Sequence, residues 1–429
     1  MQDEIARMLG KTPVPAFYRT EFDVCGDKIP DIAQGVRQAL TREGTLDRIK
    51  PGHRVAVTVG SREINRVDVI TRTLVDELKR IGAQPFLFPA MGSHGGATAE
   101  GQREILAGYG VTEETMGVPV VSCMNTVEVG KTPGGLPVHA DKAAFEADAI
   151  IPVGRIKPHP EFKGSYESGI MKMLAIGVGK QHGANMCHQL GMDHMPENIL
   201  AFGRVLIEKC HIPFGIGIIE NALHGTNSIT AIPAECIEAE EPALLQTAKS
   251  LIPVIPFEKV DVIICEEMGK DLSGTGMDSN VIGRSISLGV SRPFAERIGV
   301  FRLTEKTHGN FNGVGLADSI SRRLFDEMSF PMTYPNTITA CEPFAVKIPP
   351  VMDTDLLCLY FCLQTCIHAN SPEGIRVVWI KNTLSVHTFY ISEALVKEAQ
   401  ANPKLHVSGQ REKPSFDSEG AFAGFVPLQ

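Results

Sequence analysis

Apolar and polar residues alternate in blocks along the first half of the chain. Four short, nearly continuous apolar runs predict buried β-strands; they lie at 54–60, 85–90, 149–154 and 214–220. After the first run, apolar residues recur at helical spacing and predict a helix over 65–82: Val67, Ile70, Leu74 and Leu78. Strands that alternate with helices are typical of an α/β domain with a largely parallel sheet.

The second half of the chain repeats this order of elements. Apolar runs at 260–266 and 299–303 predict two strands, and the second leads through the Gly-rich stretch THGNFNGVGLADS into a predicted helix. Between the halves, the segment IPVIPFEKV holds two prolines in four residues, which favours a linker. We therefore expect two α/β domains with largely parallel sheets, an N-terminal domain of residues 1–255 and a C-terminal domain of residues 256–429.

Composition limits the classes of function. Of the 429 residues, 43% are hydrophobic and 21% are charged, as in an ordinary globular enzyme. The formal net charge of −9 argues against broad binding to nucleic acid, which needs a basic face. No uncharged apolar run reaches the roughly 18 residues of a membrane span, and the opening MQDEIARMLG lacks the apolar core of a secretory signal, so we expect a cytoplasmic protein.

Three of the predicted strands end in segments that suit ligand binding. In parallel α/β sheets, ligands bind outside the carboxyl ends of the strands. Here the strand ends are followed by Gly60-Ser61-Arg62, by Gly92-Ser93-His94-Gly95-Gly96 and by Arg155 to His159. The glycines of the second segment let backbone N–H groups approach an anion, and a helix with Thr98 as its N-cap follows. One interpretation is a phosphate or carboxylate site; the other is a loop that only turns the chain.

The stretch from Arg155 to His194 is rich in groups that bind metals or form covalent bonds. It holds four of the thirteen histidines, and imidazole suits nickel, zinc, copper or iron. Lys172 lies among apolar residues in GIMKMLAIG, where partial desolvation would lower the pKa of its amine and favour covalent attachment. The alternative is a lysine whose stem packs on the rim of the sheet while its amine stays in water.

Two histidines on neighbouring loops, His94 and His159, can act as a general acid and a general base on opposite sides of a substrate. A racemase needs such a pair, because it must act on both faces of one carbon. The alternative is that each histidine only satisfies its nitrogens within a loop. Three later histidines recur at steps of six, which is not helical spacing, so at most one or two can reach the same metal: His182, His188 and His194.

A cysteine stripe in the second half allows two interpretations. Cys358, Cys362 and Cys366 recur at i, i+4 and i+8, which places the three sulfurs on one face of a helix, and His368 follows. One interpretation is a metal or iron–sulfur site. The other, which we favour, is a buried stripe, because free cysteine is among the most buried residue types.

Around these residues the chain resembles the nickel-dependent lactate racemase family. The similarity covers most of the N-terminal half and continues more weakly beyond it. Members carry a nickel-pincer nucleotide, a pyridinium mononucleotide that binds nickel through two sulfur arms and a ring carbon. The resemblance implies that Lys172 carries this cofactor and that His188, sixteen residues later, completes the nickel coordination. It also implies that His94 and His159 are the acid/base pair.

The resemblance further implies how ligands are held. The family's arginine after the first strand matches Arg62, whose guanidinium fork would bind the substrate carboxylate bidentately. The cofactor would lie in the cleft between the two domains. Its binding would draw on the loops after the first two strands, at Ser61, Gly92, Ser93, Gly95 and Gly96.

Some positions of the N-terminal half depart from the family pattern. The interval from His159 to Lys172 is three residues longer than in the family. Met171 stands where the family has an arginine, and the family's aspartate after the first strand falls on Val59. The machinery that holds the cofactor nevertheless remains recognisable.

The substrate-binding pattern of the C-terminal half differs more. Asp278-Ser279-Asn280 matches the family's Asp-x-Asn, but the two positions of its substrate clamp fall on Gly283 and Ile286. Lys270 and Arg284 lie nearby in the sequence and are candidate replacements that would bind the substrate. The resemblance therefore implies a homologue of lactate racemase with a substrate larger or more polar than lactate.

The sequence predicts a racemase or epimerase of a 2-hydroxy acid, working by reversible hydride transfer to the lysine-tethered cofactor, which carries the difficult step. Two alternatives stay open. One is a metal-assisted hydrolase or lyase with zinc between His94, His159 and His188. The other is a non-enzymatic anion-binding or cofactor-carrier protein. The expected partners are the small-molecule acid and the proteins that build the cofactor, with no nucleic acid and no membrane.

Overall fold

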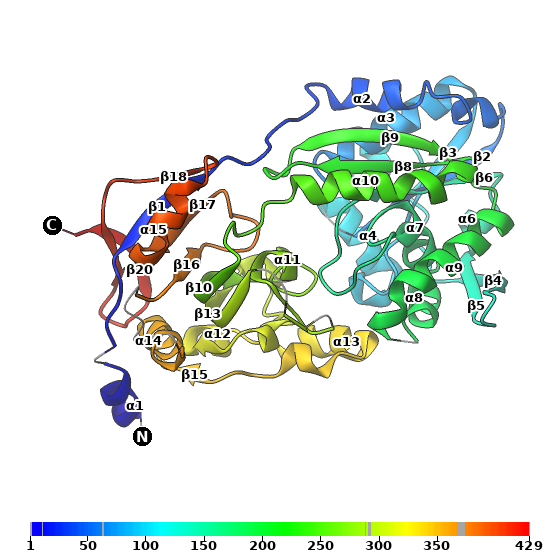
Figure 1. The fold of residues 1–429 in the computed structure, drawn as a ribbon. Coiled ribbons are helices and arrows are strands. Elements are labelled where there is room, and N and C mark those ends of the chain that lie inside the picture. Colours follow the sequence, from blue (N-terminus) through cyan, green and yellow to red (C-terminus); the bar gives the residue numbers. More distant parts are fainter. Residues whose placement is uncertain are drawn as a thin grey trace. The chain divides into compact units, whose positions relative to one another are not determined.

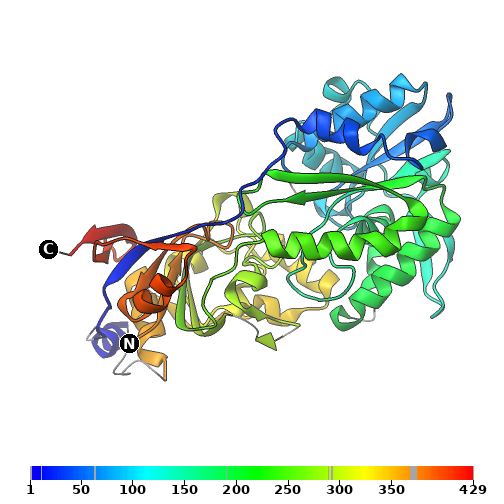
Figure 2. The ribbon, with the colours of Figure 1, turned by 45° about the horizontal axis from the view of Figure 1, so that its top comes forward.

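The computed structural model describes residues 2–10, 12–61, 64–189, 191–287, 289–290, 293–367 and 374–428. Contacts within the chain divide it into two compact units. We call Cys25–Ile252 the N-terminal unit, and the combination of Met1–Val24 with Pro253–Gln429 the C-terminal unit. Figure 1 and Figure 2 show the elements of each unit as a ribbon.

The strands of the N-terminal unit form three small sheets. They are β2 (Arg54–Val59), β3 (Gln84–Pro89), β4 (Thr126–Lys131), β5 (Pro137–Asp141), β6 (Ala149–Ile151), β7 (Val153–Arg155), β8 (Phe214–Glu220) and β9 (Thr226–Pro233). The sheet β3-β2-β6 is parallel throughout. In the sheet β7-β8-β9 the first pair is parallel and the second antiparallel, and β4 pairs with β5 in an antiparallel hairpin.

Helices cover these sheets and connect their strands. They are α2 (Ile32–Ala39), α3 (Val67–Arg80), α4 (Ala99–Gly108), α5 (Glu113–Met116), α6 (Lys142–Phe145), α7 (Ile170–Lys172), the π-helix η3 (Met173–Val178), α8 (Lys180–His188), α9 (Met195–Lys209) and α10 (Ile237–Leu251). The helix α4 begins as expected, because the side chain of Thr98 accepts the N–H of Gly101 at 3.0 Å.

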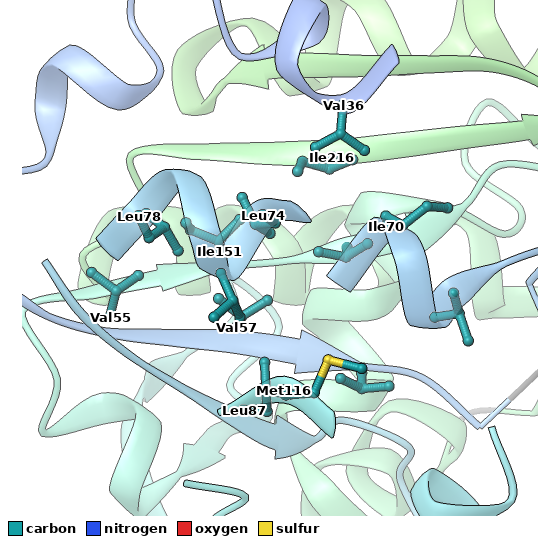
Figure 3. Packing of buried hydrophobic residues seen from close by; sticks show 14 of the residues in the cluster. Val36, Val55, Val57, Ile70, Leu74, Leu78, Leu87, Met116, Ile151 and Ile216 are labelled. Carbon is teal, nitrogen blue, oxygen red and sulfur yellow. The ribbon is translucent and has the colours of Figure 1, made fainter. Parts of the chain in front are cut away.

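The main core of the N-terminal unit lies between α3 and the parallel sheet (Figure 3). Apolar residues of α3 recur every four positions and meet those of β2, β3 and β6; they include Ile70, Leu74, Leu78, Val55, Val57, Leu87 and Ile151. Burying each such side chain stabilises the fold by about 1.5–3 kcal/mol. The predicted strands at 54–60, 85–90 and 214–220 and the predicted helix at 65–82 are confirmed.

The predicted strand at 149–154 is divided in two by Pro152. Proline has no N–H to donate to a ladder, so β6 ends at Ile151 and the chain changes sheet. The carbonyl of Pro152 accepts the N–H of Ile216 at 2.8 Å, which begins the pairing of β7 with β8. The hydroxyl of Thr58 in β2 accepts the N–H of Val153 at 2.8 Å and keeps the two sheets in contact.

The C-terminal unit is built on one large mixed sheet. Its strands are β1 (Phe17–Phe22), β10 (Lys259–Met268), β13 (Phe294–Leu303), β14 (Ser319–Ser321), β15 (Val351–Met352), β16 (Val377–Ile380), β17 (Thr388–Ser392), β18 (Leu405–Val407), β19 (Glu412–Phe416) and β20 (Phe422–Pro427). From β15 through β14, β13 and β10 to β16 the pairs are parallel; from β16 through β17, β1 and β19 to β20 they are antiparallel. The predicted strands at 260–266 and 299–303 are parts of β10 and β13.

Short helices complete this unit, together with a hairpin of β11 (Arg284–Ser285) and β12 (Gly289–Val290). The helices are α1 (Gln2–Leu9), α11 (Ser279–Ile282), α12 (Arg322–Asp326), α13 (Phe330–Ala340), α14 (Asp355–Thr365) and α15 (Val396–Ala401). Within the described ranges, no helix has the length and apolar character needed to cross a membrane.

The cysteine stripe lies on α14 and at its end, and it belongs to the core. Cys358 and Cys362 are fully buried and Cys366 nearly so. A side chain at Gly299 of β13 would place its Cβ 3.0 Å from the sulfur of Cys362, so this glycine lets the helix approach the strand. Burial raises the pKa of Cys366 to about 12, which keeps the thiol protonated. The buried-stripe interpretation is confirmed; His368 lies outside the described residues.

Candidate active site

The π-helix η3 packs against the carboxyl ends of β2 and β3. A Cβ added to Gly60, the residue after β2, would lie 3.1 Å from the terminal carbon of Met173. A Cβ added to Gly177 would lie only 2.6 Å from the carbonyl oxygen of Ala90, just after β3. The approach at Gly177 requires glycine, because a backbone carbonyl cannot move aside. Both contacts place the helix that begins after Lys172 at the sheet edge where ligands of parallel sheets bind.

The first turn before Lys172 is held by a buried carboxylate from α10, a helix that packs along β8 (Figure 2). Glu241 is 1% exposed, and its side chain accepts the N–H of Met171 at 3.0 Å. A Cβ at Gly169 would lie 2.1 Å from the same carboxylate, so only glycine allows this contact. Burial raises the pKa of Glu241 to about 7, against the opposing effect of the backbone N–H groups of Met171 and Ile170.

Phe162 connects Lys172 with His159. The ring of His159 stacks on Phe162 with centroids 4.0 Å apart, and the amine of Lys172 lies 5.3 Å from the centroid of the same buried ring. A cation over an aromatic face is attracted by the ring quadrupole. The structure therefore brings these two predicted residues to one side chain, which the sequence analysis did not single out.

A second buried carboxylate, Glu167, holds the loop of His159. It accepts the backbone N–H of His159 at 2.7 Å and that of Gly164 at 3.2 Å. Its charge is balanced by Lys249 of α10 at 2.7 Å and by Lys163 at 3.8 Å. The loop is thus fixed by a fully buried, fully paired carboxylate rather than left as a mobile turn.

The imidazole of His159 is oriented by its own loop. Its Nδ1 accepts the backbone N–H of Glu161 at 3.1 Å. A nitrogen that accepts a hydrogen bond carries no proton, so the neutral ring carries its proton on Nε2. In this arrangement His159 is a proton donor through Nε2, and it can accept a proton there only by releasing Glu161.

The chain turns back between Lys172 and His188. In a continuous α-helix, sixteen residues would separate the two Cα atoms by about 24 Å. Here the π-helix η3 ends at Gly179, and Lys180 has φ of 54°, which breaks the helix and lets α8 pack against η3. The charge of Lys172 consequently reaches His188 and contributes to lowering its pKa.

The neutral ring and the hydrogen bonding of His188 suit a metal ligand. Burial is the largest cause that lowers its pKa, and the nearby Lys172 adds to it, so the neutral ring is favoured. Its Nδ1 lies 2.7 Å from the carbonyl oxygen of Ala184 and donates to it, which leaves the lone pair on Nε2. Among the described residues, no group of three or more His, Cys, Asp or Glu side chains could hold a metal ion.

The loop of His94 contacts the same helical pair. A Cβ on Gly92 would lie 3.3 Å from Ile176 of η3 and 3.3 Å from Ala184 of α8, whose carbonyl holds His188. Gly92, Gly95 and Gly96 all have positive φ, from 57° to 64°, a conformation that favours glycine. At Gly95 a side chain is also excluded, because its Cβ would lie 2.6 Å from the backbone of Gly101.

Other predicted residues are placed differently. Arg62 lies outside the described residues; its neighbour Ser61 offers its carbonyl to the hydroxyl of Tyr109 at 2.8 Å. Arg155 forms a largely buried ion pair with Glu220. His182 lies against His139, with ring centroids 4.1 Å apart.

In the C-terminal unit, the side chains predicted to bind substrate form hydrogen bonds and an ion pair within the protein. Lys270 donates to the carbonyl of Gly274, within its own loop, at 2.7 Å. Arg284 pairs with Asp318 at 2.7 Å, and its guanidinium also donates to the backbone carbonyls of Leu316, Ala295 and Glu296. Binding of a substrate by Arg284 would have to replace these bonds, so its predicted role has no support in this geometry.

Comparison with known proteins identifies a matching domain and a similar solved structure. Residues 22–199, which include His94, His159, Lys172 and His188, match the model of the lactate racemase N-terminal domain. Among solved structures, the chain is similar to the lactate racemase apoprotein from Thermoanaerobacterium thermosaccharolyticum. The TM-score is 0.51 at 13% identity, over 85% of this chain and 96% of that one. A search of curated proteins by sequence finds no match.

The protein has an α/β fold in which the helix η3 after Lys172 packs at the carboxyl ends of β2 and β3, and His159 and Lys172 both contact Phe162. Residues 22–199 thus match a lactate racemase N-terminal domain, and the chain as a whole shares the fold of lactate racemase.

Proposed function

We propose that this protein is a racemase or epimerase of a 2-hydroxy acid that uses a nickel-pincer nucleotide tethered to Lys172. The observation that supports the proposal is the turn at Lys180, which folds α8 back onto η3, so that the charge of Lys172 acts on His188. Lys172 as a tether and His188 as a metal ligand can serve one cofactor only if both side chains reach it.

The residues present fit this cofactor. Lys172 would carry it, and Nε2 of His188 would complete the coordination of nickel, because Nδ1 is committed to Ala184. When bound, the cofactor supplies an electrophilic ring carbon that accepts the hydride from C2 of the substrate and returns it. The glycines after β3 and Ser61 would line its nucleotide part, where backbone N–H groups suit an anion.

His94 and His159 would move the hydroxyl proton. Nε2 of His159 carries the hydrogen of the neutral ring, so this atom would donate a hydrogen bond to the substrate oxygen before any proton moves. His94 would then be the group that first accepts the proton of the substrate hydroxyl. Return of the hydride to the opposite face of C2 would give the other stereoisomer, with the substrate oxygen taking its proton from the protonated form of His159. The two histidines would exchange roles in the reverse direction.

For the substrate we propose a 2-hydroxy acid larger or more polar than lactate. Arg62 would bind its carboxylate, since a guanidinium fork fits a carboxylate bidentately. The family's clamp positions fall on Gly283 and Ile286, which offer no polar side chain. Lys270 is the proposed contact for a second polar group, since Arg284 would first have to release Asp318 and the backbone carbonyls that it binds.

The test uses protein from its native host, or protein co-produced with that host's cofactor-building proteins. Intact mass and peptide mapping should find an adduct on Lys172, with nickel bound to the same protein. Lys172→Ala should lose both, whereas Lys209→Ala, which changes an exposed lysine of the same unit, should keep both. An adduct mapped to Lys163 or Lys180 would contradict the assignment.

Turnover is measured by chiral chromatography on lactate and on longer, dicarboxylic and sugar-derived 2-hydroxy acids. We expect stereochemical exchange with one of the larger acids and slow exchange with lactate. An adduct without turnover on any of these acids would favour a cofactor carrier. Hydrolysis or elimination that depends on zinc would favour the metal-assisted hydrolase or lyase.

A further inference from the structure

Lys180 is a fully buried lysine at the turn between η3 and α8. Its amine donates to the carbonyl of Pro89 and to Oε1 of Gln102 at 3.2 Å, and it lies 3.3 Å from the carboxylate of Asp141, which is also fully buried. The three hydrogens of the ammonium thus have three acceptors. Burial lowers the pKa of Lys180, and the charge of Asp141 opposes that change.

The turn itself does not call for a lysine. At a φ of 54°, glycine or asparagine is the common residue, and burying an ammonium costs free energy unless it is paired. The contacts of the amine are therefore the reason for a lysine at this position. Those contacts reach the end of β3, the start of α6 and the first half of α4.

Gln102 carries the contact from Lys180 to the loop of His94. Its side chain is fully buried, and because Oε1 faces the ammonium, its NH2 group must point the other way. That group donates to the carbonyls of Gly92 at 3.0 Å and His94 at 3.2 Å. The ammonium thus fixes the orientation of an amide that in turn fixes the loop.

We propose that Lys180 is a positioning residue. Through Gln102, it fixes the position of the His94 loop relative to the turn that precedes α8, the helix of His188. The importance of Lys180 for the reaction rests on the proposed function, since Lys180 would position His94, a proposed acid/base residue, relative to His188, the proposed metal ligand. The physical link between the two segments is independent of that function. A misplacement of about 1 Å in such a site can slow a reaction by about 10²-fold.

Hydrogen–deuterium exchange on the full-length protein tests the link. In the double variant Lys180→Met/Asp141→Asn, which removes both buried charges and keeps a side chain able to cap α6, segments 91–97 and 173–189 should both exchange about tenfold faster or more. Gln102→Glu keeps an acceptor for Lys180 but loses the donors to the loop. It should open segment 91–97 and leave 173–189 as in the wild type.

Two further variants complete the design. Leu78→Ala removes a fully buried side chain near the opposite end of the parallel sheet and serves as a control for general loss of stability. It should not produce local opening of either segment. If the double variant does not fold, Asp141→Asn alone should give the same two-segment pattern with smaller increases. Faster exchange confined to 173–189 in the lysine variant would overturn the proposal.

The loaded enzyme adds a second readout. Lys180→Met/Asp141→Asn and Gln102→Glu should both keep the adduct on Lys172 and lower kcat about tenfold or more, with KM within about twofold. A fall in kcat that Leu78→Ala reproduces at equal residual stability would show a merely structural role. The expected exchange pattern without turnover on any 2-hydroxy acid would refute the proposed function and leave the link standing.

Discussion

The buried carboxylate of Glu241 should make the N-terminal unit less stable as the pH rises. Its pKa is raised from the usual 4.5 to about 7 in the folded state. Between these values the folded protein holds a proton that the unfolded chain has released, so stability is full below pH 4.5 and is lost as the pH rises through 7. The difference of 2.5 units at 1.36 kcal/mol per unit is about 3 kcal/mol.

Glu241→Gln should abolish this loss, because an amide does not ionise. The free energy of unfolding of the variant, minus that of the wild type, should rise by about 2.5 kcal/mol between pH 5 and pH 8. Urea denaturation followed by far-ultraviolet circular dichroism at several pH values measures the difference. Trp379, the single tryptophan, lies in β16 of the C-terminal unit, and its fluorescence transition should not respond to the substitution.

Glu240→Gln provides the matched control, with the same substitution one residue away on α10. The ion pair with Arg42 lowers the pKa of Glu240, so its contribution is present at neutral pH and is lost as the pH falls. This control should show no gain in stability relative to the wild type from pH 5 to pH 8. A Glu241→Gln difference that is flat or falls with pH would refute the reasoning about the buried charge.

Three further outcomes are expected. His188→Ala should keep the adduct on Lys172 but lose nickel, measured by elemental analysis of protein whose adduct is quantified by mass. His94→Ala and His159→Ala should each lower turnover by about 10²-fold or more while the unfolding midpoint changes little; turnover near the wild-type rate would remove that histidine from the reaction. Arg284→Ala should lower the stability of the C-terminal unit by about 3 kcal/mol, seen in Trp379 fluorescence, because it leaves Asp318 partly buried without its partner.

Local signals in the sequence were enough for several of the elements and for a choice of candidate site residues. The strand ends and the helix after β2 follow from periodicity, and His94, His159, Lys172 and His188 stand out by residue type and spacing. Pro152 was also visible, but its effect on the sheet was missed, because a hydrophobic run alone does not show where a ladder lacks an N–H donor.

The residues that hold the site could not be predicted, because they act through contacts distant in sequence. Glu241 lies seventy residues from the Met171 N–H that it accepts, and Gln102 lies seventy-eight from Lys180. A buried lysine and a surface lysine look alike in one sequence. The glycine at 169 was the available signal, because its lack of a side chain marks a close approach.

The position of β1 has a consequence for how the chain is made. This strand pairs with β17 and β18, yet about 366 residues separate Phe22 from Thr388. At a synthesis rate of roughly 5–20 residues per second, β1 waits for roughly 20–70 s before its partners exist, while the whole N-terminal unit emerges and can fold. During this interval its backbone N–H and C=O groups lie open to other chains. We therefore expect the ribosome-bound protein to depend on chaperones at β1, and the C-terminal unit to become protease-resistant after the N-terminal unit.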